Sequence, residues 1–138
     1  MSTPMAESTP IERKPPPGTF SVLVVDDEPL IRWSLRRAFL DRGHVVATAG
    51  TGSEALAVLS GGRYDAVILD YRLPDRQDLS LLSEVRRLAP QSAVLMMTAF
   101  ADDGMRAGAI ELGARAVVDK PFLLKAFVAQ VEASVRDH

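Results

Sequence analysis

Short apolar runs, each ending at a polar residue, are the feature of this chain that most restricts its fold. SVLVV precedes Asp26, AVIL precedes Asp70, AVLMM precedes Thr98, and RAVV stands just before Asp119 and Lys120. Runs of this kind, separated by longer amphipathic stretches, are typical of βα units around a parallel sheet. Ligands bind at the carboxyl ends of the strands in such a sheet. The polar residues are therefore candidates for one common site.

The pattern predicts five strands and five helices after residue 20. The expected strands are 21–25, 44–48, 65–69, 93–97 and 115–118. The expected helices are about 29–42, 52–60, 78–88, 102–112 and 122–136. Pro29 stands at a helix start, where its missing N–H is tolerated, and Thr51 with Glu54 forms a capping box before the second helix. The apolar side of the last helix is expected to consist of Leu123, Phe127, Val131 and Val135.

The positions of the polar residues also predict the order of the strands. The second strand ends at Thr48 and Ala49 and carries no comparable polar group. If this strand lies at the edge, in the order 2-1-3-4-5, the other four strands are neighbours and their polar ends meet. That is the flavodoxin-like order, with its switch point between strands 1 and 3. The predicted fold class is therefore α/β: a doubly wound (βα)5 domain with a parallel five-stranded sheet.

Composition sets the remaining bounds. A length of 138 residues suits one domain, and a chain without cysteine has no thiolate or disulfide chemistry. Sixteen basic and eighteen acidic residues give a net charge of −2, which offers no electrostatic footprint for nucleic acid or an anionic membrane. No apolar stretch approaches the length of a bilayer span, and the N-terminus has no signal-peptide pattern. We expect a cytoplasmic protein without direct contact to nucleic acid or membrane.

Residues 1–19 differ from the rest of the chain. They contain five of the nine prolines and few large apolar residues. Such a segment cannot bury enough apolar surface to offset the entropy of ordering it. We expect a disordered, proline-rich N-terminal tail over residues 1–19 and one folded domain over residues 20–138.

The polar strand ends suggest a chemistry. Asp26 and Asp27, followed by Glu28, repel one another and attract a cation, and Mg²⁺ is typically held by one or two carboxylates together with water. Asp70 is a candidate nucleophile, because carboxylates form aspartyl-phosphates. The hydroxyl of Thr98 and the ammonium of a nearby lysine would stabilise a transferred phosphoryl group. Taken singly, each residue also has a simpler interpretation as a helix cap, a turn residue or a surface charge.

Four sequence stretches together resemble the response-regulator receiver domain, the CheY-like domain of two-component signal transduction. They are VLVVDDEP, AVILDYRLP, MMTAF, and DKPF after GARAVV, and the resemblance covers about residues 20–137. It implies that Asp70 is the phosphoacceptor and that Asp26, Asp27 and the backbone carbonyl of Arg72 join Asp70 in binding Mg²⁺. The other roles that it implies are phosphoryl contacts for Thr98 and Lys120.

The resemblance also implies partners and a response to phosphorylation. The phosphoryl group would come from a histidine kinase or a histidine phosphotransfer protein that docks near Trp33. Phosphorylation would switch the face of helix 4, strand 5 and helix 5 for an unknown output partner or in a homodimer. Catalysis would be limited to the domain's own phosphotransfer and dephosphorylation, and the Lys120–Pro121 bond would be cis.

Two positions differ from the family pattern. Val117 replaces the family's usual aromatic switch residue, for which Phe100 could substitute, and Asp78 replaces a common glycine.

Several alternatives stay open at this stage. Gly50 to Ala55 fits the dinucleotide-binding pattern G-x-G-x-x-A, with Asp70 twenty residues after Gly50. An aspartyl-nucleophile phosphatase of the haloacid-dehalogenase type would need a second aspartate two residues after the nucleophile, where this chain has Arg72. A receiver that acts only as a phosphorylation-independent docking module is a third alternative. The stretch VVDDEPLIRWSL resembles receivers that form the N-terminal part of longer, ATPase-type transcriptional activators.

Overall fold

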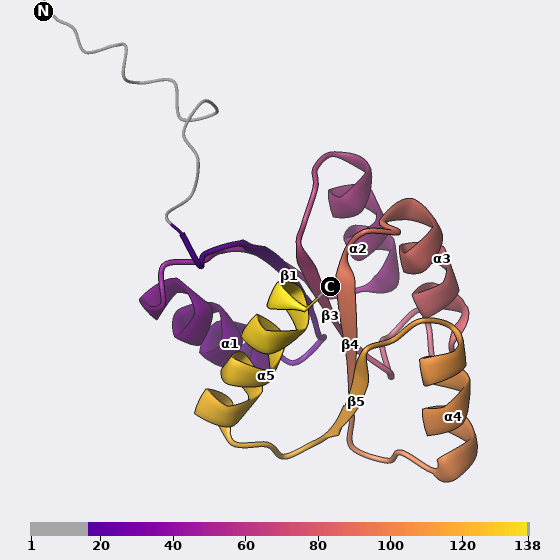
Figure 1. Cartoon of the computed structure of the whole chain (residues 1–138). Coiled ribbons are helices and arrows are strands. Elements are labelled where there is room, and N and C mark those ends of the chain that lie inside the picture. Colours follow the sequence, from indigo (N-terminus) through magenta and orange to yellow (C-terminus); the bar gives the residue numbers. More distant parts are fainter. Residues whose placement is uncertain (1–16, 138) are drawn as a thin grey trace, which may run out of the picture.

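The computed structural model describes residues 17–137, which form a five-stranded parallel sheet covered by helices on both faces (Figure 1). The strands are β1 (Ser21–Val25), β2 (Val45–Ala49), β3 (Ala66–Asp70), β4 (Ala93–Thr98) and β5 (Ala116–Asp119). The helices are α1 (Pro29–Asp41), α2 (Gly52–Ser60), α3 (Ser80–Leu88), α4 (Asp103–Glu111) and α5 (Leu124–Arg136). Residues 1–16 of the expected tail lie outside the described part of the chain.

The sheet has the strand order β2-β1-β3-β4-β5, which confirms the order predicted from the polar strand ends. β1 pairs in parallel with both β2 and β3, and β4 pairs in parallel with β3 and β5. Every residue of β3 and β4 is buried, as expected for central strands with helices on both faces. The doubly wound α/β fold is therefore as predicted.

Two apolar clusters fill the space between the sheet and the helices. On one face α1 and α5 pack against the sheet around Phe39 and Phe127, which are 0% and 1% exposed. On the other face α2, α3 and α4 cover a cluster that includes Leu69, Leu82 and Met105. In Figure 1 these two layers lie on opposite sides of the sheet.

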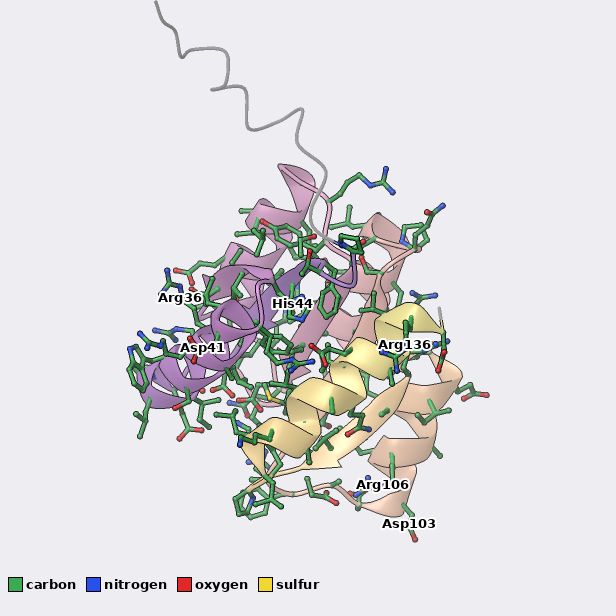
Figure 2. All side chains as sticks on the ribbon, turned by 60° about the vertical axis from the view of Figure 1, so that its left-hand side comes forward. Arg36, Asp41, His44, Asp103, Arg106 and Arg136 are labelled. Carbon is green, nitrogen blue, oxygen red and sulfur yellow. The ribbon has the colours of Figure 1, made fainter. Side chains whose placement is uncertain are left out.

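The side chain of His44 is buried, unlike those of the charged residues labelled on the helix surfaces (Figure 2). Arg36, Asp103 and Arg136 are exposed on the helices, whereas His44 is 3% exposed and stacks on Phe20 with ring centroids 3.9 Å apart. Its Nδ1 accepts the backbone N–H of Phe20, and its Nε2 lies 2.8 Å from the carboxylate of a glutamate on α5. His44 therefore connects the start of β1 to α5.

Several predicted boundaries were wrong by one or two residues. Helix α3 begins at Ser80 rather than 78, because the Asp78 carboxylate accepts the backbone N–H and the hydroxyl of Ser80 and so stabilises a turn before the helix. Helix α5 begins at Leu124, and Leu123, which was expected on its apolar side, is 79% exposed outside the helix. The capping side chain of Thr51 is confirmed, since it accepts the N–H of Glu54.

Candidate functional site

The sheet brings the polar strand ends together at its carboxyl edge. Asp26 directly follows β1, Asp70 ends β3, Thr98 ends β4, and Lys120 directly follows β5. Asp70 is paired in register with Met97, so Thr98 lies one residue further along the neighbouring strand. Because β1, β3, β4 and β5 are consecutive in the sheet, all four side chains start from one edge. The site predicted from the sequence is thus assembled from four different strands.

Three carboxylates converge at this edge. One oxygen from each of Asp26, Asp27 and Asp70 lies within 4.8 Å of the others. Asp26 is fully buried and Asp70 is 7% exposed, while Asp27 faces solvent. Asp26 is held firmly, since its Oδ1 accepts the N–H of Glu28 at 2.9 Å and its backbone carbonyl accepts a bond from Arg32 at 2.7 Å. The cluster is therefore partly rigid and open to solvent on one side.

Lys120 supplies the positive charge that faces these acids. Its Nζ donates to Asp26 Oδ2 at 2.8 Å, to Asp70 Oδ2 at 3.2 Å and to Glu28 Oε1 at 3.4 Å. Burial by itself would lower the pKa of Lys120, but the bonds and charges of Asp26 and Asp70 outweigh it and raise the pKa. The backbone N–H of Lys120 also donates to the carbonyl of Thr98, and the Lys120–Pro121 bond is cis, as expected.

The surroundings of Asp70 disfavour the ionisation of its carboxyl group. Burial, followed by the negative charge of Asp26, raises its pKa from 3.8 to about 6, and Lys120 opposes this rise only in part. The carboxylates around Asp70 thus exceed the positive charge available to them. Such a set of oxygen ligands suits a hard divalent cation, and Mg²⁺ fits because it uses few carboxylates and keeps several waters.

Thr98 presents a hydroxyl at the same edge. The residue is 1% exposed, and its Oγ1 accepts the backbone N–H of Phe100 at 3.1 Å. An accepting hydroxyl keeps its own proton, which it can donate to another oxygen. Thr98 can therefore offer a hydrogen bond to an anion bound beside Asp70.

The sequence did not reveal a pair of side chains beside the site. Arg72 lies two residues after Asp70 and Phe100 two residues after Thr98, and the guanidinium carbon of Arg72 stands 5.3 Å from the centre of the Phe100 ring. This distance is that of a cation–π contact. The matching offsets on neighbouring strands were the available signal, because residues two positions beyond adjacent strand ends can meet.

The glycine motif has a structural role unrelated to a nucleotide. The N–H groups of Gly52 and Ser53, which a pyrophosphate would need, donate to the carboxylate of Asp75 at 2.8 and 3.0 Å. The dinucleotide-binding alternative therefore has no free helix terminus at this motif. The glutamate of the capping box binds the N–H of Gly50 instead of the Thr51 N–H.

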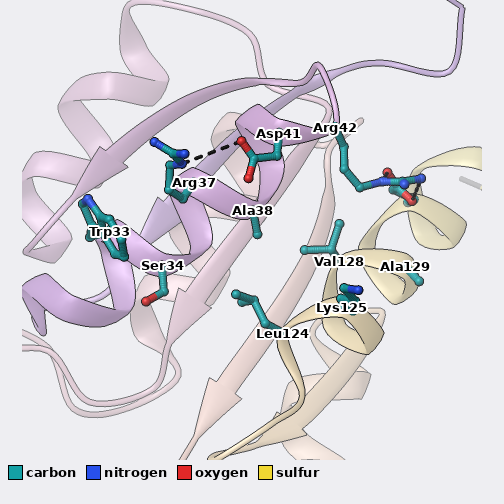
Figure 3. A pocket seen from close by; sticks show the side chains of 11 residues that line it. Trp33, Ser34, Arg37, Ala38, Asp41, Arg42, Leu124, Lys125, Val128 and Ala129 are labelled. Atoms are coloured by element: carbon teal, nitrogen blue, oxygen red, sulfur yellow. Dashed lines mark hydrogen bonds and ion pairs between the residues drawn. The ribbon is translucent and has the colours of Figure 1, made fainter.

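A groove of about 600 Å³ lies between α1 and α5 (Figure 3). Trp33 lines this groove and is 60% exposed. Leu124 and Val128 line the groove from α5.

Among the helices of residues 17–137, none is both long and apolar enough to cross a membrane.

A family model and the curated relatives of this chain indicate the same protein family. The family model described as "Response regulator receiver domain" matches residues 22–132. The chain is 37% identical over 115 residues to the transcriptional regulatory protein TcrA of Mycobacterium tuberculosis, and the match covers 83% of this chain but only 46% of TcrA. The chain therefore spans about half the length of this relative.

Solved structures share the fold. A CheY-like receiver domain protein from Methanospirillum hungatei has a TM-score of 0.82 at 25% identity, covering 85% of this chain and 94% of that chain. A response regulator from Burkholderia pseudomallei, whose structure contains a phosphorylated aspartic acid, a calcium ion and citrate, has a TM-score of 0.77 at 25% identity. That match covers 85% of this chain and 69% of the Burkholderia chain.

Proposed function

Because this chain belongs to the response regulator receiver domain family of two-component signalling, we propose that Asp70 accepts a phosphoryl group from a phosphohistidine. The donor would be a histidine kinase or a histidine phosphotransfer protein. The observation that carries this proposal is the setting of Asp70: a nearly buried carboxylate 3.2 Å from the ammonium of Lys120 and within reach of the acids after β1. Residues 20–138 form the proposed receiver domain.

The proposed step is an in-line displacement at phosphorus. A carboxylate oxygen of Asp70 forms a bond to phosphorus while the P–N bond of the phosphohistidine breaks, and the leaving imidazole nitrogen keeps the electron pair and takes up a proton. Lys120 and Thr98 would bind the phosphoryl oxygens, where negative charge is spread in the transition state. Hydrolysis of the aspartyl-phosphate by water would return the free carboxylate.

Mg²⁺ is part of the proposal. Asp26, Asp27, Asp70 and the backbone carbonyl of Arg72 would hold it, and bound Mg²⁺ would neutralise charge on the phosphoryl oxygens. The excess of carboxylates over ammonium groups at this edge supports it. The phosphorylated aspartic acid and calcium ion in the Burkholderia protein support the same chemistry by analogy.

We propose that phosphorylation changes the conformation of the face formed by α4, β5 and α5. Arg106 on α4 donates to the carbonyl of Val117 at 3.0 Å and pairs with Asp119 at 2.8 Å, so it connects α4 to β5 where the family usually has an aromatic residue. The output would be a partner, a second copy of the chain, or a domain of a longer transcriptional regulator, as the length of TcrA suggests. A cytoplasmic location belongs to this proposal.

The donor would dock beside the site on α1, near Trp33. This assignment follows from the family and from the exposed tryptophan at the edge of the groove between α1 and α5. The groove is lined by residues of α1 from Trp33 to Asp41 and by residues of α5 from Leu124 to Glu132 (Figure 3).

Intact-mass analysis after incubation with acetyl phosphate and Mg²⁺ tests the proposal. We expect one added phosphoryl group on the wild-type protein and on Asp103→Asn, a control that removes an exposed acid on α4. Asp70→Asn should stay unlabelled. Labelling of Asp70→Asn at the wild-type level would refute the assignment, and an unlabelled wild-type protein that still binds its partner would favour the docking module.

A further inference from the structure

A single carboxylate anchors the turn after Asp70 to the start of α2. Asp75 Oδ1 accepts the N–H of Gly52 at 2.8 Å, and Oδ2 accepts the N–H of Ser53 at 3.0 Å and its hydroxyl at 3.1 Å. The first turn of a helix attracts negative charge through its unpaired N–H groups. The Gly52 bond is the main reason that the pKa of Asp75 lies below its ordinary value. Asp75 thus fills the anion position of α2 from within the chain.

The turn that carries Asp75 is tight and fixed on its other sides. Leu73 and Arg76 exchange backbone hydrogen bonds of 2.8 and 3.2 Å, with Pro74 and Asp75 between them. Leu73 is 1% exposed within the apolar cluster. The guanidinium of Arg76 donates to side chains on α3, namely Ser80 at 3.0 Å and Glu84 at 2.5 Å. The core, α3 and α2 therefore each hold one side of the turn.

Gly52 permits the close approach of the turn to α2. A Cβ atom at this position would lie 2.9 Å from Arg76 Cγ and 3.3 Å from Asp75 Oδ1. The first contact is shorter than real Cβ atoms make, so a side chain at this position would force the Arg76 side chain to move. This accounts for the second glycine of the G-x-G-x-x-A pattern without a nucleotide.

The anchored turn begins directly after Arg72. The N–H of Arg72 points to Asp70 Oδ1 at 3.4 Å, so the residue spans the short distance between the proposed phosphoacceptor and the turn. Its backbone carbonyl is the proposed ligand of Mg²⁺. Mg²⁺ requires nearly ideal octahedral geometry, and a carbonyl on a loosely held loop would meet that requirement less often.

We infer that Asp75 is a positioning residue for the metal site. Its bonds to α2 hold the turn, and through the turn they hold the Arg72 carbonyl where a bound Mg²⁺ needs it. This inference rests on the proposed function, because it assigns a supporting contact to the Mg²⁺ site of the receiver. It also gives α2, which carries none of the proposed phosphoryl or metal contacts, a supporting role at the metal site.

Titration calorimetry with Mg²⁺ tests the inference on three variants. Asp75→Ala removes all three bonds to α2 and should weaken Mg²⁺ binding about tenfold, as is typical for groups that orient a metal ligand. Asp75→Asn keeps one acceptor and should lie between Asp75→Ala and wild type. Thr51→Ala is the matched control, because it removes the other side-chain cap of α2 and leaves Asp75 in place. We expect Thr51→Ala to lose stability and to bind Mg²⁺ as wild type does.

Amide hydrogen exchange of the metal-free proteins tests the anchor independently. Residues 71–77 should exchange faster in Asp75→Ala than in wild type or Thr51→Ala. Equal exchange in all three proteins, wild-type Mg²⁺ affinity in Asp75→Ala, or an equal loss of affinity in Thr51→Ala would overturn the inference. A wild-type protein that does not bind Mg²⁺ would instead overturn the proposed function, whatever the exchange experiment shows of the anchor.

Discussion

Replacing Asp70 with asparagine should stabilise the metal-free protein. The carboxyl group of Asp70 has its pKa raised from 3.8 to about 6, mainly by burial and then by Asp26. Since a tenfold change in an acid equilibrium corresponds to about 1.4 kcal/mol, the ionised form costs the folded protein about 3 kcal/mol. Asparagine has nearly the same shape and carries no charge. Rearrangement and water entry reduce such costs in real proteins, so we expect a gain of about 2 kcal/mol at neutral pH.

The stability difference between Asp70→Asn and wild type should grow as the pH rises. Below the unfolded pKa both states carry the proton, and Asp70 costs nothing. As the pH rises from 3.8 to about 6 the unfolded chain releases the proton while the folded protein keeps it, so the wild type loses stability relative to Asp70→Asn. Above about 6 the difference is complete and no longer changes.

Denaturant unfolding in the presence of a chelator measures this difference. The free-energy gap between Asp70→Asn and wild type should be small near pH 4 and reach about 2 kcal/mol near pH 8, which corresponds to roughly 5–10 °C in Tm. Mg²⁺ should close the gap by stabilising the wild type. Asp103→Asn, on the exposed side of α4, should show no such trend. A gap that does not change with pH, or a less stable Asp70→Asn near pH 8, would refute the reasoning.

Three further predictions concern the metal, the donor and the moving part. Asp27→Ala should weaken Mg²⁺ binding at least about tenfold while metal-free stability stays level or rises, since the three acids repel; a large loss of metal-free stability would contradict the metal role. Trp33→Ala should slow phosphotransfer from the cognate kinase and leave labelling by acetyl phosphate nearly unchanged, whereas equal losses with both donors would indicate a core role. The Mg²⁺–beryllofluoride complex should change amide exchange most across residues 98–113 and in β5, while α2 barely responds. An exchange map in which α4 is silent would refute that switch.

Helix α4 has a physical reason to be the weakest helix. Gly104 and Gly108 lie within it, and each glycine in a helix interior costs roughly 0.5–1 kcal/mol relative to alanine. Gly108→Ala does not test this weakness cleanly, because a Cβ atom there would lie 3.0 Å from Leu79 Cδ1. The alanine would gain helix propensity but would also press on the contact between α4 and the start of α3.

Much of the fold and the site's composition was predictable because the relevant signals are local. Alternation of apolar runs with amphipathic stretches locates the strands, and the position of polar residues at four of five strand ends leaves one strand for the edge. Element boundaries were less predictable, since they depend on side-chain bonds such as that of Asp78 to Ser80. Leu123 resembled a core position by spacing alone, yet it lies just before α5 and is 79% exposed.

Contacts between loops were beyond the reach of the sequence. Nothing in the local pattern indicates that Asp75 reaches α2, because this contact depends on how two loops pass one another. The glycines before α2 instead suggested a nucleotide. A glycine pattern reports a close approach of the backbone, and only the structure identifies the group that approaches.

The charges at the site explain why metal and phosphoryl group would depend on each other. Lys120 pairs with Asp26, Asp70 and Glu28. Mg²⁺ would relieve the excess negative charge, and a phosphoryl group would then restore it and compete with Asp26 for the lysine. Lys120 follows Asp119, which pairs with Arg106 on α4. We therefore expect a shift of Lys120 toward the phosphoryl group to reach α4 through the end of β5, so that this chain has a route to its output face without an aromatic residue at position 117.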